Sequence, residues 1–484
     1  MTRQQRRYHQ QKLRKLKLVP CDFKMTPASG LGTILEIFDQ SPLAEEFKKC
    51  LPERVSPRSV GHYLLALMVV AGHIHESETL TDIAQIKGDP ALEVLFEDGI
   101  AAARTIGDFL RDFEEEHILA LNEFLNKMSR AIYGHLKLVQ EDQFKPKNLI
   151  IDMDSTSHVH YGETIEGLAW NFKSEWCLDS QVAFNSLGFC HGLQLRPGNT
   201  KSGVNAEELL RLSFKDGKHQ RERRLEGKDF FRADSAYCYQ DIIKACLDLG
   251  VIFTITAHDG TTGWKKLLEQ EPMVWSAWEY SKEELERVKE VGVELPRVEL
   301  SRMHWRPSWS EGSLMFPIVV KRTWQKEKPE DKKTGQRNLF YQDSIEEKGE
   351  WVYYAVVTNW DLSLHSLTEV MRHHNKRGNG ENFIKEEKYG FKLKNFPCRS
   401  LMANHAWALL AQVAHNLLRW MALIEEPSRP HYSRKLRKRY VFNPGRVVRH
   451  ARTVVLKVMR PFYEEVTRMR EAWQATPIPA FSTA

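Results

Sequence analysis

The sequence predicts an α/β protein in which a mixed-sheet core is flanked by helical regions on both sides. Residues 30–140 have the apolar spacing of helices, whereas from Pro146 short apolar runs of strand length alternate with helical segments. The strand pattern breaks at 258–350 and returns at Trp351–Thr358, and helices follow from about Leu362 onward. Such an alternation is typical of one mixed sheet with helices packed on it.

The first helical region shows both buried positions and helix starts. Residues 64–69 are all apolar and predict a buried helix, and two Thr-x-x-Asp sequences, at Thr79 and Thr105, resemble capping boxes. Apolar residues at helical spacing predict one buried face on the second of these helices: Ile106, Phe109, Leu110 and Phe113. A DNA-binding or dimer-forming module fits this region, and so does any helical bundle.

The core is predicted from the order of its elements. Strands at 148–154, 181–187 and 189–195 precede a helix at 205–212, and strands at 229–234 and 251–256 enclose a helix at 239–249. Residues 258–350 contain six Trp and a charged run, and we interpret them as an insertion with its own strands at 315–320 and 339–342. The nearly apolar segment 403–423 predicts a buried helix.

These patterns divide the chain into six regions. We expect a basic arm, a helical DNA-binding or dimerisation region, a first core part, a β-rich insertion, a second core part with the helix of Glu381, and a basic helical C-terminal region that contacts DNA. Their expected ranges are 1–25, 26–145, 146–257, 258–350, 351–425 and 426–484.

The charge distribution is more informative than the net charge of +6. Residues 1–24 carry eight Lys or Arg against Asp22 alone, and residues 427–460 carry eleven against no acidic residue. The rest of the chain is therefore net acidic. An acidic body with two basic segments indicates a protein that binds a polyanion.

Cysteines and hydropathy limit the compartment. The seven cysteines are scattered and include no C-x-x-C pair, so neither a disulfide framework nor a cysteine zinc cluster is predicted. No apolar stretch approaches the roughly 20 residues that span a bilayer, and no apolar segment follows the basic N-terminus as in a secretory signal. We expect a soluble protein of a reducing compartment that does not interact with membranes.

Carboxylates stand where an α/β core exposes them. Asp152 and Asp154 lie two apart on one predicted strand and share a face, Asp234 ends another strand, and Glu381 follows the insertion on a helix. Oxygen ligands of this kind suit Mg²⁺ or Mn²⁺. Two such ions can support in-line phosphoryl transfer. Spacing alone leaves a cap or an ion pair as the commoner role for each single carboxylate.

The order of four motifs resembles that of a known family. Asn375-Lys-Arg377-Gly-Asn-Gly-Glu381-x6-Lys388 is similar to the Tyr-x2-Arg-x3-Glu-x6-Lys motif of the insertion-sequence-4 superfamily of DDE transposases, with His374 at the Tyr position. Asp154-Ser-Thr resembles the first Asp motif of that family, and Arg-Ala-Asp234 resembles the second. The segments 195–199 and 446–457 resemble the insertion-sequence-1380 type in particular.

The resemblance implies a ribonuclease-H-like core with a β-rich insertion, in a prokaryotic, cytoplasmic, nucleoid-associated enzyme. It implies that Asp154, Asp234 and Glu381 are catalytic and hold two Mg²⁺, for which Mn²⁺ can substitute. We rank Asp154 before Asp152 because Thr156 follows it, and Asp152 stays open as a further metal ligand. An insertion Trp that holds a flipped base is a further family feature, but six candidates leave the choice open.

The resemblance also implies partners. Terminal inverted repeats and target DNA are the expected ligands, and a homodimer on DNA is the expected assembly. Arg377, Lys388 and His374 are expected to contact end phosphates. The basic tail is expected to contact the DNA backbone, chiefly through Arg434, Lys435, Arg437, Lys438 and Arg439. The alternative interpretation is a solvated helix face.

The sequence therefore predicts a cut-and-paste DNA transposase of an insertion sequence. Such an enzyme hydrolyses strands at the terminal inverted repeats and joins the freed 3′-hydroxyls to target DNA. A ribonuclease-H-like nuclease without strand transfer and a domesticated DNA-binding protein without catalysis are the two alternatives.

Overall fold

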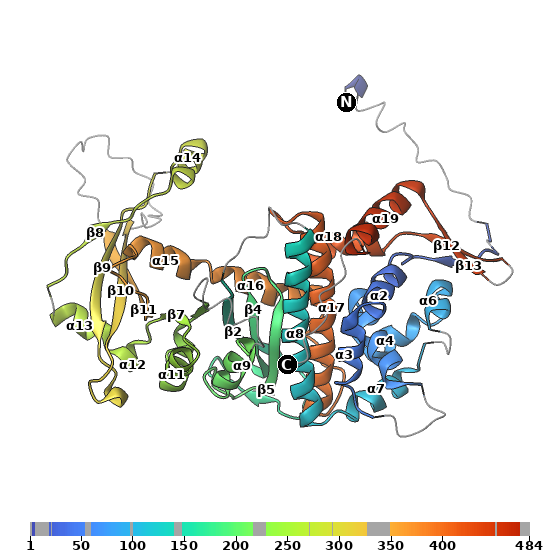
Figure 1. The fold of residues 1–484 in the computed structure, drawn as a ribbon, viewed down its shortest axis with the longest axis horizontal. Helices are drawn as coiled ribbons and strands as arrows, with labels where there is room; N and C mark the ends of the chain where they lie inside the picture. Colours follow the sequence, from blue (N-terminus) through green and yellow to red (C-terminus); the bar gives the residue numbers. More distant parts are fainter. Residues whose placement is uncertain are drawn as a thin grey trace.

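The computed structural model describes residues 2–4, 19–20, 22–53, 60–96, 100–139, 148–215, 229–270, 272–292, 294–326, 349–450 and 453–474. The molecule is elongated, with the insertion at one end, the N-terminal helices at the other and the sheet core between them (Figure 1). The predicted α/β class with flanking helices is confirmed.

Seven helices precede the core in the described chain. They are α2 (Leu31–Asp39), α3 (Pro42–Lys48), α4 (His62–Ile74), α5 (Leu80–Gln85), α6 (Pro90–Leu95), α7 (Ala103–Arg111) and α8 (Glu115–Val139). The capping box at Thr79 is confirmed, because its side chain accepts from the Asp82 N–H and Asp82 accepts from the Thr79 N–H. The box expected at Thr105 is wrong: α7 begins two residues earlier, at Ala103, and buries Ile106 and Phe109 as expected.

The core sheet is mixed, as predicted. Its strands are β2 (Ile150–Val159), β3 (Ala169–Trp170), β4 (Trp176–Asn185), β5 (Cys190–Pro197), β6 (Phe230–Ala233) and β7 (Ile252–Thr256), with α9 (Ala206–Ser213) and α11 (Gln240–Asp248) in the connections. Strands β2, β6 and β7 run parallel, and β4 pairs with β2 and β5 in antiparallel fashion. The parallel strands therefore end at one edge of the sheet.

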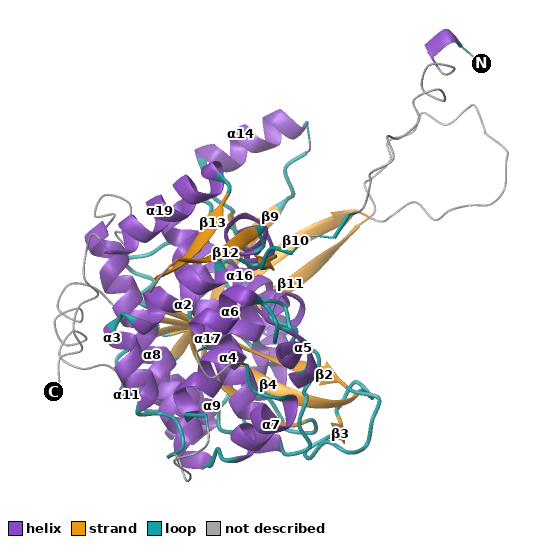
Figure 2. Ribbon diagram, turned by 90° about the vertical axis from the view of Figure 1, so that its right-hand side faces the viewer, coloured by secondary structure: helices purple, strands orange, loops and turns teal. Residues whose placement is uncertain are grey.

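The insertion does not form a sheet of its own. Its strands β8 (Ser276–Ala277), β9 (Val298–Trp305) and β10 (Phe316–Lys326) continue the core sheet, because β11 (Gly349–Thr358) pairs with both β7 and β10. Helices α12 (Asp259–Thr262), α13 (Trp264–Gln270) and α14 (Lys282–Val291) accompany these strands. The expected strand at 339–342 lies outside the described residues. The sheet therefore runs unbroken through the described core and insertion strands (Figures 1 and 2).

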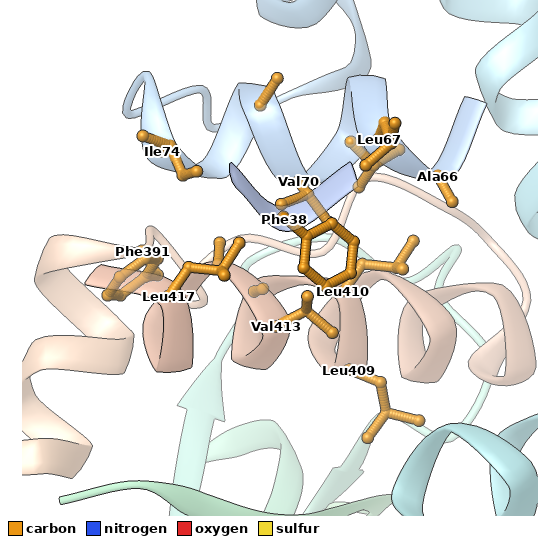
Figure 3. Packing of buried hydrophobic residues seen from close by; sticks show 14 of the residues in the cluster. Phe38, Ala66, Leu67, Val70, Ile74, Phe391, Leu409, Leu410, Val413 and Leu417 are labelled. Atoms are coloured by element: carbon orange, nitrogen blue, oxygen red, sulfur yellow. The ribbon is translucent and has the colours of Figure 1, made fainter. Parts of the chain in front are cut away.

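The insertion is followed first by α15 (Leu367–Asn375), α16 (Gly378–Lys385) and α17 (Leu401–Glu425). The predicted buried helix is confirmed as α17, whose residues 406–424 are all buried. It packs between α4, α8 and β5, and Leu410, Val413 and Leu417 meet Val70 of α4 in the core (Figure 3). Asn416 fixes α17 to the sheet, because its amide bonds both the N–H and the C=O of Cys190.

The C-terminal region is only partly helical. After α18 (Ser433–Leu436), the chain forms a hairpin of β12 (Gly445–His450) and β13 (Thr453–Val458), and α19 (Arg460–Gln474) follows. The expectation of a wholly helical tail is therefore wrong. The run Val447-Val448 and Thr453–Leu456 consists of β-branched residues and Leu, which favour strands, and β12 gains a second partner in β1 (Met25–Thr26).

A buried carboxyl group under α17 gives a pH prediction. Glu387 is buried, and Gln412 donates to one of its oxygens at 2.6 Å. Burial raises the pKa of Glu387 to about 8, so the folded protein holds a proton there that the unfolded chain releases above about pH 4.5. This contribution to stability is present below pH 4.5 and is lost as the pH rises to 8.

As the pH rises from 5 to 8, the free energy of unfolding of the Glu387→Gln variant should therefore increase by roughly several kcal/mol relative to that of the wild type. Urea unfolding at both pH values measures the gain, and Glu283→Gln on the exposed side of α14 is the control. An equal pH dependence for Glu387→Gln and the wild type would show that Glu387 is ionised in the fold.

Candidate active site

Two of the predicted carboxylates stand side by side where the parallel pairing of β2 with β6 ends, although β2 itself continues to Val159 along β4. Met153 of β2 pairs in register with Ala233 of β6, and Asp154 and Asp234 each follow by one residue. The Asp234 carboxylate also accepts from the Ala236 N–H at 2.9 Å, which fixes its orientation at the start of a short 3₁₀ turn. The edge where parallel strands end is the usual place of a site in an α/β sheet.

Glu381 reaches the same place from α16. The helix lies close over β2: a methyl group on Gly380 would stand 3.6 Å from the Asp152 Cβ. Arg377 connects the groups, since its guanidinium lies 3.3 Å from an Asp154 oxygen and 3.5 Å from a Glu381 oxygen. The structure thus brings Asp154, Asp234, Glu381 and Arg377 together from three elements far apart in the sequence.

The electrostatics match a cluster of acidic groups with too little positive charge. Burial raises the pKa of Asp154 to about 6, and the nearby charges of Asp234 and Glu381 act in the same direction, against Arg377. Burial also raises the pKa of Asp234. Three carboxylates close to one arginine would gain from further cations.

The donor set fits hard divalent cations, because all three side chains offer only carboxylate oxygens. Among the described residues, however, no group of three His, Cys, Asp or Glu side chains is gathered tightly enough to hold a metal ion. Arg377 stands between Asp154 and Glu381, and the Glu381 side chain is 53% exposed. Binding of a cation would require the Asp154 and Glu381 side chains to turn away from Arg377 and toward Asp234.

Asp152 has a different role from Asp154. Both of its oxygens accept from Arg232, at 2.6 and 2.7 Å, and both residues are buried. Arg232 also donates to the His373 carbonyl at 2.9 Å and so ties the end of α15 to the sheet. The expectation of Asp152 as a metal ligand is therefore corrected to that of a buried ion-pair partner. The role of Arg232 was not predicted from the sequence. The available signal was its position on the strand next to that of Asp152.

Two predicted phosphate contacts differ in their positions. Lys388 is half-buried and donates to the Ser157 carbonyl of β2 at 2.7 Å, three residues along the strand from Asp154. His374 is buried, with its ring nitrogens bonded to Thr254 and Tyr354, and burial lowers its pKa to about 3. A buried neutral imidazole cannot meet a phosphate, so the expectation for His374 is wrong.

The basic segment divides into exposed and buried cations. Arg434, Lys435 and Lys438 are exposed and line a cavity of about 900 Å³. Arg437 is fully buried and donates to the His73 and Ile74 carbonyls at the end of α4, and Arg439 is bound by Glu425 and Glu465. The DNA contact expected of Arg437 is therefore wrong, and the Arg439 charge is already paired.

The cavity is basic and borders the Glu381 helix. Asn379 and Phe383 face it from α16, Arg419 faces it from α17, and none of its described lining residues is acidic. Glu381 lies two residues from Asn379, or ~200° around the helix, and so points to the carboxylate side. Helix α16 thus separates an acidic centre from a cationic cavity. Arg419 was not predicted, because its neighbours in the sequence are apolar.

This mixed sheet, with Asp154 on β2, Asp234 directly after the neighbouring strand β6 and Glu381 on helix α16, is compatible with the ribonuclease-H-like core of DDE transposases. A family model described as "Transposase DDE domain group 1" matches residues 14–472. The chain belongs to this family. No curated protein matches the chain. Among the described residues, no helix is both long and apolar enough to cross a membrane.

Proposed function

We propose that this transposase moves an insertion sequence by cut-and-paste transposition, as a member of the insertion-sequence-4 superfamily and of its insertion-sequence-1380 type. The observation that carries the proposal is the meeting of Asp154, Asp234 and Glu381 around Arg377. Hydrolysis of a strand at each terminal inverted repeat would free a 3′-hydroxyl, and this hydroxyl would then attack a phosphate of target DNA.

The three carboxylates would hold two Mg²⁺ or Mn²⁺ ions. Such ions, when bound, supply activation of the attacking oxygen and stabilisation of the leaving oxygen. Arg377 would release the carboxylates and turn to the end phosphate, and Lys388 would approach the same strand. Phosphate contacts of this kind fix the register of the DNA rather than its sequence.

The cationic cavity supports a path for the DNA backbone beside α16. Arg434 and Lys435 are both exposed in it, and neither has an acidic partner among the described residues. Lys438 would add a third contact. The proposed assembly is a homodimer on DNA, with the helices of 26–145 contributing to DNA binding or to the dimer contact.

The double variant Arg434→Ala/Lys435→Ala should bind DNA more weakly, with the slope of log affinity against log salt reduced by about two. Fluorescence anisotropy at several salt concentrations measures this slope. Lys282→Ala/Lys289→Ala, on the exposed side of α14, is the matched control. An unchanged slope in the Arg434/Lys435 variant would remove the cavity from the DNA path.

Excision in cells tests the function itself. A plasmid with a marker between the inverted repeats should lose the marker when the wild-type chain is expressed, and should keep it with Glu381→Gln. Excision that continues in Glu381→Gln would contradict the proposed role of α16. Excision absent even from the wild type would favour the domesticated DNA-binding protein.

A further inference from the structure

The hairpin of β12 and β13 is an exposed ribbon with one open face. Strand β12 lies between β1 and β13, so β13 forms the edge of a three-stranded sheet. Residues 453–457 of β13 are all exposed, and Val454 and Val455 are 43% and 42% exposed. The hairpin extends from the body next to α19 (Figure 1).

The register defines which side chains share the open face. Arg446 pairs with Lys457, Val448 with Val455, and His450 with Thr453, and cross-strand partners project to the same side of a sheet. The other side packs on the body at its base: a methyl group on Gly445 would meet Ser29 at 2.9 Å, and Val447 is buried. The open face therefore consists of Arg446, Val448, His450, Thr453, Val455 and Lys457.

This face lacks a partner for its charge. Arg446 and Lys457 stand directly opposite each other, a like-charge pair that destabilises an isolated ribbon. No ion pair joins Arg446, Arg449 or Lys457 to an acidic group within the described ranges, and the sequence has no acidic residue from 427 to 463. An anion between the strands would relieve this repulsion, whereas a second copy of the same basic edge would add to it.

The hairpin also joins the two basic segments of the chain. β1 directly follows the basic arm, the Lys24 carbonyl accepts from the Val447 N–H, and the Arg446 guanidinium stacks on Phe23 at 3.4 Å. β1, which follows the basic arm in the sequence, is thus held against the base of the ribbon.

We infer that the β12–β13 hairpin is a DNA-reading ribbon that enters the major groove and recognises the terminal repeat. The major groove is about 12 Å wide and admits a two-stranded ribbon. Arg446 and Lys457 at the base meet the backbone phosphates. His450 and Thr453 at the tip present hydrogen-bonding groups to base edges, and Val455 offers a methyl surface to thymine.

This inference rests on the proposed function and changes which part of the protein reads the DNA sequence. The helices of 26–145 are the region expected to bind DNA or to dimerise, whereas α4 and α7 pack against α17 in the core. The ribbon lies apart from α16 and β2, which carry Glu381 and Asp154, on the side of the N-terminal helices (Figure 1), so it would read base pairs away from the cleaved phosphate.

Binding without cleavage tests the ribbon separately from catalysis. The full-length protein is titrated in Ca²⁺ with a duplex of the terminal repeat and with a scrambled duplex of equal composition. The tip variant His450→Ala/Thr453→Ala should lose about tenfold or more in affinity for the repeat and little for the scrambled duplex. Lys457→Ala should weaken both duplexes equally and lower the salt slope by about one.

Controls separate the possible outcomes. Arg302→Ala removes an exposed strand arginine elsewhere in the sheet and should change neither affinity. Because the titration measures binding alone, its outcome holds even if the proposed catalysis fails. Unchanged discrimination in the tip variant, or a change only in the salt slope, would overturn groove reading. A DNA-free dimer that dissociates in Lys457→Ala or in the tip variant would instead identify the ribbon as a subunit contact.

Discussion

The Asp154→Asn variant should lose DNA strand cleavage by about a thousandfold or more while it still folds and binds DNA. Its carboxylate lies beside Asp234, just past the last parallel pair of β2 and β6, and contacts Arg377, so an amide removes one negative ligand from the proposed ion site. Loss of a metal ligand removes several kcal/mol of transition-state stabilisation, roughly, and each 1.36 kcal/mol is about tenfold in rate. Cleavage of a labelled end duplex in Mg²⁺ measures the loss.

Matched variants make this result specific. Asp234→Asn and Glu381→Gln should show losses of the same order, whereas Asp241→Asn, at an exposed position on α11, should cleave like the wild type. If Asp154→Asn kept its activity while a folded Asp152→Asn variant lost it, the assignment of the first carboxylate would be reversed.

The Asp152→Ala variant should instead lose stability, by about 3–5 kcal/mol, because it leaves the buried Arg232 charge without its partner. The double variant Asp152→Leu/Arg232→Met should recover much of this loss, since it buries no charge. Urea unfolding of the four members of this cycle measures the coupling free energy.

A surface pair calibrates that result. Asp248 pairs with Arg211 at 2.8 Å but is 60% exposed, so Asp248→Ala should cost less than about 1 kcal/mol. A similarly small cost for Asp152→Ala would mean that the Arg232 charge finds water or another partner, and the buried pair would not hold the sheet edge in place.

The order of core elements could be predicted because short apolar runs and Gly or Pro breaks are local signals. Strands β5, β6 and β7 lie close to the expected ranges, whereas β2 continues to Val159 and β4 begins at Trp176, beyond the expected limits, so that Asp154 lies within its strand and Asp234 directly after its own. The meeting of Asp154 and Asp234 depended on parallel pairing of β2 with β6, which the residues alone do not specify. The continuous sheet into the insertion was missed for the same reason, since pairing of β11 with β7 is a long-range contact.

The errors concern residues whose burial depends on distant partners. Arg437 stands in an exposed-looking basic run, yet it donates to carbonyls at the end of α4, more than 300 positions away in sequence. His374 lies beside the catalytic motif, yet Thr254 and Tyr354 enclose it. Sequence distinguishes neither residue from its solvated neighbours, because residue type gives charge but not surroundings.

Strand joining by the wild-type protein tests the central claim most directly. Pre-cut duplexes with a free 3′-hydroxyl at the terminal repeat are incubated with supercoiled plasmid and Mg²⁺, and the plasmid is examined for covalently attached ends. The proposed function predicts joined product with the wild type and none with Asp154→Asn or Glu381→Gln. Plasmid that is nicked or cut without attached ends would contradict transposition and identify a nuclease.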